Sequence, residues 1–295
     1  MGGRNDDGGA GRGAGTNRFP VLRRAVAGAL GRGGVVTGEL PEDLRPRALA
    51  IVERGAAGEP LGRELTLLSY NIKRAERASR VAESLRRAVE SYRPQVVLLQ
   101  ETPVAFFREG AAAELLAGRH LFFAPFHRVE GAQRRYPHPL YGQLTATTSP
   151  MTGHRVVELP TVNPATLGPA HTLTRIALYA ELETADGRRL GLVNVHNEPF
   201  ARRHRRVLQH RAFLDVVERR APDVAVCCGD FNPSASQRGE PGIRLLEAHG
   251  FGNAFARRWR TLDTCLARGH AGFAEARRLR LPGSDHRPIL VRLLL

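Results

Sequence analysis

Short apolar runs recur along the chain, and several of them end in a carboxylate, amide or imidazole side chain. The clearest is 223–232, whose Val and Cys residues show no polar alternation and predict a strand covered on both faces. Gly229 allows a close backbone approach, and Pro233 ends the strand. Asp230 and Asn232 therefore share one face of its tip. Taken alone, this tip is equally typical of an ordinary polar turn.

The segments before this strand alternate between strand and helix patterns. Residues 65–71 and 95–101 are apolar runs that end in Asn71 and Glu101. Between them, residues 76–92 carry apolar side chains at three-four spacing, which predicts an amphipathic helix. This strand–helix–strand order is typical of a βαβ unit, and both strands place a polar group at the end where ligands gather in α/β sheets.

Further elements follow the same two periodicities. Helices are predicted within 103–125, at 202–220 and at 241–249, and strands at 141–148, 155–159, 174–183, 189–196, 261–267 and 288–294. Asp186-Gly187 indicates a hairpin turn between two of these strands. The many hairpin-linked strands exceed what a simple doubly wound sheet accommodates, so we predict a mixed α/β sandwich. The segments 127–140 and 160–172 are predicted to be loops.

The N-terminal part carries no chemical pattern. Residues 1–18 are rich in Gly and Arg and are predicted to be disordered. Two apolar-spaced segments, 21–30 and 43–54, predict short helices in an extension or linker at 19–63. The main compact domain is predicted at 64–295.

Composition limits the class of partner only weakly. The formal net charge of +15 suits a polyanion. Because Lys73 is the only lysine, we interpret this charge as a bias toward Arg, and nucleic acid stays one candidate partner among several.

The three cysteines show no zinc spacing and no disulfide framework. No signal-peptide pattern and no apolar run of transmembrane length is visible, so we expect a soluble, cytoplasmic protein, and a monomer.

Polar residues at the predicted strand ends form one candidate site. They come from separate strands or strand-end loops: Asn71, Glu101, His196, Asp230, Asn232, Asp263, Asp285 and His286. Hard oxygen donors without thiolates favour Mg²⁺ or Mn²⁺ over zinc. Histidines beside carboxylates suit proton transfer and the binding of phosphate oxygens. Each residue also has a structural explanation as a cap, turn or core group, and only their joint occurrence favours a functional site.

The motifs themselves carry a resemblance. The chain contains, in order, SYNI (69–72), LLQE (98–101), GQLTATTSPM (142–151), NVHNE (194–198), GDFN (229–232), GFGNAF (250–255), LDTCLARG (262–269) and SDHRPI (284–289). Together they resemble the endonuclease/exonuclease/phosphatase family with the DNase I-like fold, over about residues 64–295. The resemblance implies a four-layer α/β sandwich, with two mixed β-sheets packed face to face and flanked by helices. It also implies Mg²⁺-dependent phosphoester hydrolysis by an activated water.

The resemblance assigns roles to the candidate residues. It makes Asn71, Glu101 and Asp285 metal ligands, with Glu101 the principal one, and Mg²⁺ the expected cofactor, with Mn²⁺ an alternative. Asp230 would orient or deprotonate the water, Asn232 would contact phosphate or metal, and His196 would donate to a phosphate oxygen or assist the leaving group. His286 would face the scissile phosphate while Asp263 holds its other ring nitrogen. The implied substrate is a phosphate ester, whether DNA, RNA, nucleotide, inositol or lipid.

Some positions depart from the family pattern. Thr264 stands where many members carry His, Thr147-Thr148 replaces Ser-Arg, and Asn253 stands in place of Asp. These departures leave the substrate open. A catalytically inactive, basic nucleic-acid-binding protein on the same fold is the alternative.

Other polar residues near the motifs are interpreted as structural. We assign Arg175, Tyr141 and Gln143 to structural or loop roles before any role in a cleft. An unrelated α/β hydrolase is disfavoured, since no Gly-x-Ser-x-Gly elbow is present.

Overall fold

The computed structural model describes residues 45–56, 58–109, 111–128, 140–160, 175–199, 201–233, 239–255 and 261–295. The chain divides into residues Met1–Glu39 and Leu40–Leu295, and every described residue belongs to the second unit. The tail predicted at 1–18, the helix predicted at 21–30 and most of both predicted loops therefore lie outside the described residues.

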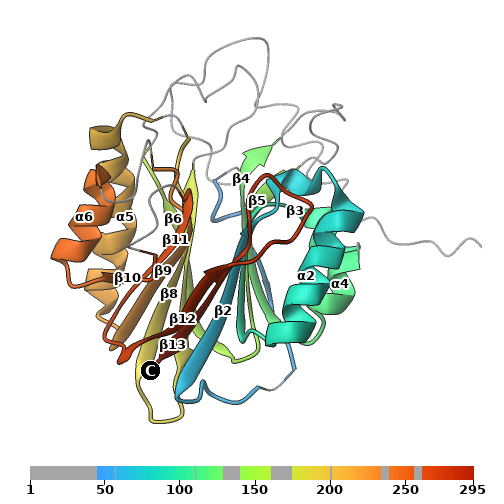
Figure 1. Ribbon diagram of the computed structural model, residues 1–295, viewed down its shortest axis with the longest axis horizontal. Helices are drawn as coiled ribbons and strands as arrows, with labels where there is room; N and C mark the ends of the chain where they lie inside the picture. Colours follow the sequence, from blue (N-terminus) through green and yellow to red (C-terminus); the bar gives the residue numbers. More distant parts are fainter. Residues whose placement is uncertain are drawn as a thin grey trace, which may run out of the picture. The chain divides into compact units, whose positions relative to one another are not determined.

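Two β-sheets form the centre of this unit (Figure 1). The seven-stranded sheet has the order β1-β4-β5-β3-β2-β13-β12, and the six-stranded sheet has the order β10-β11-β9-β8-β7-β6. The strands are β1 Ile51–Glu53, β2 Glu64–Asn71, β3 Val96–Pro103, β4 His120–Arg128, β5 Leu140–Thr147, β6 Met151–Glu158, β7 Ile176–Glu183, β8 Arg189–His196, β9 Val224–Asp230, β10 Gly252–Asn253, β11 Asp263–Arg268, β12 Gly272–Arg278 and β13 Ile289–Leu294. Each sheet is mixed, because β2 runs parallel to β3 and β8 runs parallel to β9 among antiparallel neighbours.

Helices cover the outer faces of both sheets (Figure 1). α2 (Ala78–Tyr92), α3 (Val104–Arg108) and α4 (Ala111–Leu115) lie on the seven-stranded sheet, while α5 (Arg203–Arg220) and α6 (Pro241–Ala248) lie on the six-stranded sheet. The predicted four-layer α/β sandwich is thus confirmed. None of the helices in the described ranges combines the length and the apolar character that crossing a membrane requires.

Apolar side chains fill the three spaces between these four layers. Leu85 of α2 packs with Leu99 of β3 in the first space, and Leu67 of β2 belongs to the cluster between the two sheets. Phe213 of α5 packs with Val193 of β8 in the third. Burying a side chain of this size stabilises the folded state by about 1.5–3 kcal/mol. The strands whose ends carry polar groups are therefore held in place by apolar packing.

Buried amide side chains tie the two sheets together. Gln100 Nε2 donates to Asn194 Oδ1 at 2.8 Å, and Asn194 Nδ2 donates to the Leu144 carbonyl at 3.0 Å. Gln143 Nε2 donates to the Ile176 carbonyl of the other sheet. The interpretation of Gln143 as structural agrees with this contact. Because a buried amide without partners is costly, these bonds hold the sheets in one relative position.

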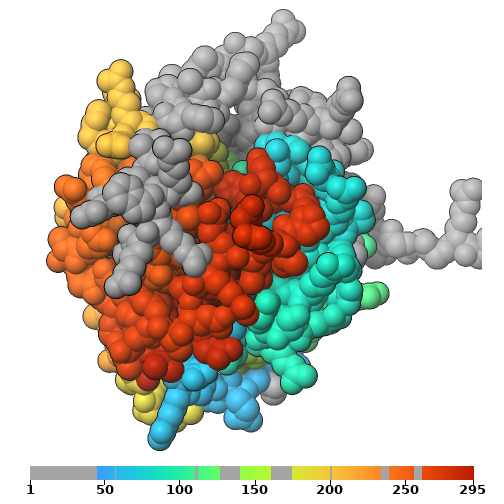
Figure 2. Space-filling view, viewed as in Figure 1, coloured from blue at the N-terminus to red at the C-terminus, as the bar shows by residue number. Residues whose placement is uncertain are grey.

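The segment between β12 and β13 carries the Asp285-His286 pair past α2. Ser84 Oγ of α2 and Tyr70 Oη of β2 both donate to the Pro282 carbonyl. Ser284 Oγ donates to the carbonyl of Asn71 at 2.8 Å. Figure 2 shows this C-terminal segment in red directly beside α2 in cyan. The loop is thereby held against the end of β2.

The structure differs from the sequence prediction at two sheet edges, where one predicted helix is wrong and one strand was not predicted. The helix predicted at 43–54 is wrong over its described residues, since 45–49 form turns and Ile51–Glu53 forms edge strand β1, which pairs antiparallel with β4. Four apolar positions do not establish a helix, and the exposed edge of β4 supplies backbone partners instead. Strand β12 was not predicted, because its Glu- and Arg-rich sequence, partly exposed at a sheet edge, shows no apolar alternation.

Gly229 and Gly187 provide a matched test of the backbone at the end of β9. Gly229 has φ +144°, and a Cβ there would lie 2.1 Å from the Val195 carbonyl oxygen. Gly187, with φ +81°, has no atom within 4 Å of an added Cβ. We expect Gly229→Ala to lower the free energy of unfolding by about 3 kcal/mol or more, and Gly187→Ala by about 1 kcal/mol. Urea unfolding measures both, and equal losses would contradict the close approach of β8 and β9.

Candidate active site

The candidate site lies where the two parallel strand pairs end, one pair in each sheet. β2 ends at Asn71 and β9 ends at Asp230, and Asn71 Nδ2 donates to Asp230 Oδ2 at 3.0 Å across the sheets. Within the six-stranded sheet, strand register places two further residues beside Asp230. His196 lies opposite Asp230 in the parallel pair, and Asp263 lies opposite Asp230 in the antiparallel pair. Four predicted residues from two sheets thus meet at one edge.

The buried carboxylate of Asp230 is the centre of this group. Its Oδ2 accepts from Asn71 and lies 3.7 Å from Nε2 of both His196 and His286. Its Oδ1 accepts from the backbone N–H of Asn232 at 3.0 Å. Side chains from both sheets and from the loop before β13 therefore face a single carboxylate.

Asp263 and His286 form a hydrogen-bonded pair beside it. His286 Nδ1 lies 2.9 Å from Asp263 Oδ2, so Nδ1–H donates and Nε2 faces Asp230. One donor atom from each of these three residues lies within 4.8 Å of the other two. The arrangement matches the partner that the sequence predicted for His286.

Burial and neighbouring charges set the protonation of these groups. Burial raises the pKa of Asp230 to about 7; the charge of His286 opposes this, and that of Asp263 adds to it. Burial alone would lower the pKa of His286, but the hydrogen bond that it donates to Asp263 and the charges of the nearby carboxylates raise it to about 10. Burial, followed by the charges of Arg175 and His286, holds the pKa of His196 well below its usual value. Near neutral pH the site pairs one cationic histidine with one neutral histidine.

Glu101 presents the most accessible carboxylate of the group. Its backbone is left-handed, with φ +53°. Oε1 accepts from Asn71 Nδ2 at 3.3 Å and lies 3.8 Å from His196 Nε2. Oε2 lies 3.5 Å from Nη1 of Arg74. The carboxamide of Asn71 therefore bridges Glu101 and Asp230.

Arg175 belongs to the site, although its sequence position suggested a structural role. Its Nη1 lies 3.4 Å from His196 Nδ1, and its guanidinium stacks 4.7 Å from the centroid of Phe126. The Phe126 ring also meets the His196 ring edge-on at 5.2 Å between centroids. The only local signal was a cationic residue directly before β7, which is too common to single out. Its proximity to His196 arises from the β7–β8 pairing.

Asn232 reaches the site through its backbone. It adopts φ +46°, its N–H donates to Asp230, and its Nδ2 donates to the Asn197 carbonyl at 2.9 Å. Asn197 Nδ2 in turn lies 3.3 Å from both the Phe231 carbonyl and His210 Nε2. Asn197 and His210 were not among the predicted site residues, although Asn197 lies within the NVHNE motif and His210 within the predicted helix at 202–220. They brace the loop that follows β9.

Asp285 is not brought into the group around Asp230. Its side chain is 57% exposed, and Oδ2 lies 2.9 Å from Nζ of Lys73. Burial would raise the pKa of Asp285, but the hydrogen bond from Lys73 and the charges of His286 and Lys73 together outweigh it, and the pKa falls below its usual value. The other seven predicted residues are linked to one another by the contacts given above.

The donor set suits a divalent metal ion. Three carboxylates, from Glu101, Asp230 and Asp263, lie close together, and two of them are buried. Oxygen-rich groups of this kind favour hard cations such as Mg²⁺, Mn²⁺ or Ca²⁺. A cation would also offset the cost of keeping several carboxylates in low-dielectric surroundings.

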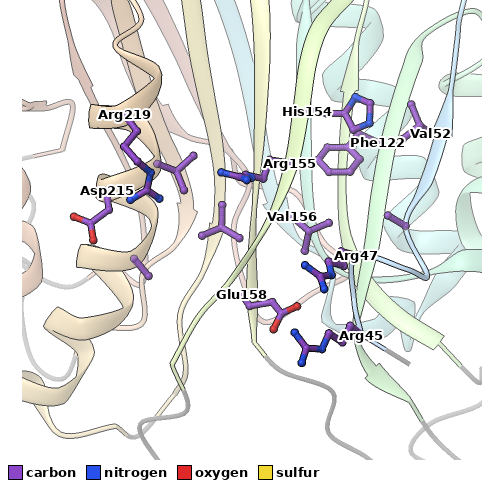
Figure 3. Close-up of a pocket in the computed structure, with 14 residues that line it drawn as sticks. Arg45, Arg47, Val52, Phe122, His154, Arg155, Val156, Glu158, Asp215 and Arg219 are labelled. Carbon is purple, nitrogen blue, oxygen red and sulfur yellow. The ribbon is translucent and has the colours of Figure 1, made fainter. Parts of the chain in front are cut away.

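A separate groove of about 780 Å³ lies along edge strand β6 (Figure 3). Arg155 and Val156 of β6, Arg219 and Asp215 of α5 and the segment from Arg45 to Val52 contribute to its walls. None of the candidate residues lines this groove. Its arginines, on an arginine-rich surface, face Glu158 and Asp215 as well, so the groove has no single charge character.

Comparison with known proteins identifies the family. The family model described as "Endonuclease/Exonuclease/phosphatase family" matches residues 68–286. Among curated proteins, none matches this sequence.

Solved structures agree in fold. An endonuclease/exonuclease/phosphatase from Beutenbergia cavernae DSM 12333 is 18% identical over 79% of this chain and 72% of that one, with a TM-score of 0.60. The human Nocturnin catalytic domain with bound sulfate anion is 18% identical over 84% and 98%, with a TM-score of 0.59. D. rerio TDP2 complexed with a single-strand DNA product is 13% identical over 78% and 98%, with a TM-score of 0.56.

The family model covers well over half of the chain, and the strand-end motifs that resembled the family are the ones that the fold brings together. This chain therefore belongs to the endonuclease/exonuclease/phosphatase family.

Proposed function

We propose that this protein is a Mg²⁺-dependent phosphoesterase that hydrolyses a phosphodiester or phosphomonoester by attack of water. One observation carries the proposal: the buried Asp230 carboxylate lies 3.7 Å from both His196 and His286, with Glu101 3.8 Å from His196. A base, a cationic donor and a carboxylate open to a metal ion are thus within reach of one small substrate group.

Asp230 is the residue we assign to the water. Its carboxylate is held by Asn71 and by the Asn232 N–H, so its orientation is determined before substrate binds. Burial raises its pKa to about 7, which matches a base that accepts a proton near neutral pH. Asp263 acts through His286 by holding its Nδ1–H, so that the Nε2–H is directed into the site.

Cationic and neutral donors suit the phosphate oxygens. His286, whose pKa is about 10, stays protonated and stabilises negative charge on the phosphoryl group. His196 and Arg175 lie together on the other side of Asp230, and we assign them to a phosphate oxygen or to the leaving group. Arg175 was not part of the predicted set, and its position beside His196 supports including it.

We assign the metal ion to Glu101 and Asn71, and the position of Asp285 against Lys73 argues for a lesser role of that carboxylate. A bound Mg²⁺ would neutralise charge that develops on the phosphoryl oxygens. Asn71 also donates to both Glu101 and Asp230, so it holds the metal-binding carboxylate and the water-activating carboxylate next to each other.

Nucleic acid is the first substrate class to test. The D. rerio TDP2 structure holds a single-strand DNA product, and the Nocturnin structure holds a sulfate, a tetrahedral anion like phosphate. The net charge of +15 is compatible with a polyanionic substrate. These observations favour a nuclease-type substrate over an uncharged ester and leave the choice among phosphate esters to experiment.

Removal of the two central groups tests the catalytic assignment. We expect Asp230→Asn and His286→Gln each to lower kcat on bis(p-nitrophenyl) phosphate by at least about 100-fold, since each removes acid–base or charge-stabilising chemistry. Asp186→Asn in the exposed β7–β8 hairpin is the matched control and should keep full activity. Circular dichroism confirms folding. A folded Asp230→Asn or His286→Gln protein with parental activity would overturn the assignment.

Metal removal separates the enzyme from its alternative, an inactive nucleic-acid-binding protein on the same fold. We expect EDTA to abolish hydrolysis of single-stranded DNA and a molar excess of Mg²⁺ or Mn²⁺ to restore it, because the oxygen-rich donor set suits these ions. A gel-based cleavage assay measures this. DNA binding that weakens steeply with salt, without Mg²⁺-dependent cleavage of any phosphate ester in a panel, would favour the binding protein instead.

A further inference from the structure

The short turn between β2 and α2 directs two cationic side chains back toward the site. Three consecutive residues, Lys73, Arg74 and Ala75, have positive φ values of 47°, 57° and 52°. L-residues adopt this conformation at a cost, and a run of three is uncommon. The backbone N–H of Lys73 donates to Asn71 Oδ1 at 3.0 Å, which anchors the turn to the end of β2. The turn is therefore attached directly to Asn71, a residue of the candidate site.

Arg74 lies between two carboxylates, and one of them is the expected metal ligand. Its Nη1 is 3.5 Å from Glu101 Oε2, and its Nη2 is paired with Glu76 Oε1. The Arg74 side chain is 16% exposed and that of Glu101 is 22% exposed, so water screens this pair only in part. Lys73 holds Asp285 in the same manner at 2.9 Å. Two carboxylates that the sequence assigned to a metal are therefore paired with cations of the chain itself.

We propose that Arg74 is an internal counter-cation of Glu101 that a divalent metal ion has to displace, and that it thereby lowers the metal affinity of the site. The inference rests on the proposed metal-dependent function. A divalent ion on Glu101 and a guanidinium 3.5 Å from the same carboxylate repel each other. Metal loading therefore requires the Arg74 guanidinium to release Glu101 while it keeps Glu76, its second partner.

The groups near Glu101 show in which direction a change at Arg74 should alter metal affinity. Two basic side chains of the described part of the chain approach this carboxylate: Nη1 of Arg74 lies 3.5 Å from Oε2, and Nε2 of His196 lies 3.8 Å from Oε1. The guanidinium of Arg74 carries its positive charge at every working pH. Glu76 remains as a partner for the displaced guanidinium, which limits the cost of displacement. Loss of the guanidinium charge should then tighten metal binding.

The test is calorimetric titration of the full chain with Mn²⁺ and with Mg²⁺ at constant ionic strength. We expect Arg74→Gln and Arg74→Met to bind Mn²⁺ about three- to tenfold more tightly than the parent, while Arg74→Lys, which keeps the charge, stays close to it. Arg86→Gln is the matched control, because Arg86 pairs with Glu83 and Glu90 on the exposed face of α2. It should bind Mn²⁺ as the parent does. Thermal unfolding of each variant confirms that it is folded.

A double-mutant cycle locates the effect. In a Glu101→Gln background, Mn²⁺ binding should be weaker and Arg74→Gln should no longer tighten it, since the coupled carboxylate is gone. Parental or weaker affinity in folded Arg74→Gln and Arg74→Met, a gain of the same size in Arg86→Gln, or a gain that persists without Glu101 would each overturn the inference. If instead the parent neither binds these ions nor cleaves any phosphate ester, the proposed function fails, and this inference fails with it.

Discussion

The organisation of the site depends on one hydrogen bond, from Asn71 Nδ2 to Asp230 Oδ2, which joins the last residues of β2 and β9 across the sandwich. Both residues are buried, so loss of the bond would leave polar groups unsatisfied at a cost of about 1–3 kcal/mol. With the two strand ends held together, register brings His196 and Asp263 into place beside Asp230. The functional geometry is therefore a consequence of how two sheets meet, and each sheet alone supplies only half of it.

The same edge concentrates backbone strain and buried charge. Glu101 and Asn232 both have left-handed φ values, and each such residue costs about 1–3 kcal/mol. Neighbouring carboxylates add an electrostatic cost that cations from separate parts of the chain offset: His286 from the loop before β13 and Arg74 from the turn after β2. Three apolar layers and the amide bridges between the sheets hold this arrangement. Strain and charge at a site supported by a rigid base are typical of binding and catalysis.

The sequence predicted the elements that have a long apolar run or a consistent apolar face. The strands at 65–71, 95–101 and 223–232 and the helix at 76–92 have long, unambiguous apolar patterns, and the structure confirms them within a few residues. The prediction from sequence failed at the edges of the sheets. β1 has three residues and gains its stability from pairing with β4. In β12 a register shift lies between Phe273 and Ala276, the two side chains that pack on the core, so neither strand carries a periodic signal.

By itself, the sequence determined which polar residues stand at strand ends, because a strand's apolar run and the polar residue that closes it are adjacent in the chain. Only the tertiary structure decided which partners those residues take. Asp285 is held by Lys73, Arg175 lies against His196, and Asn232 donates to the Asn197 carbonyl. The reason is physical: these pairings depend on the register between strands and on loop packing across two sheets, and no local period in the sequence encodes either.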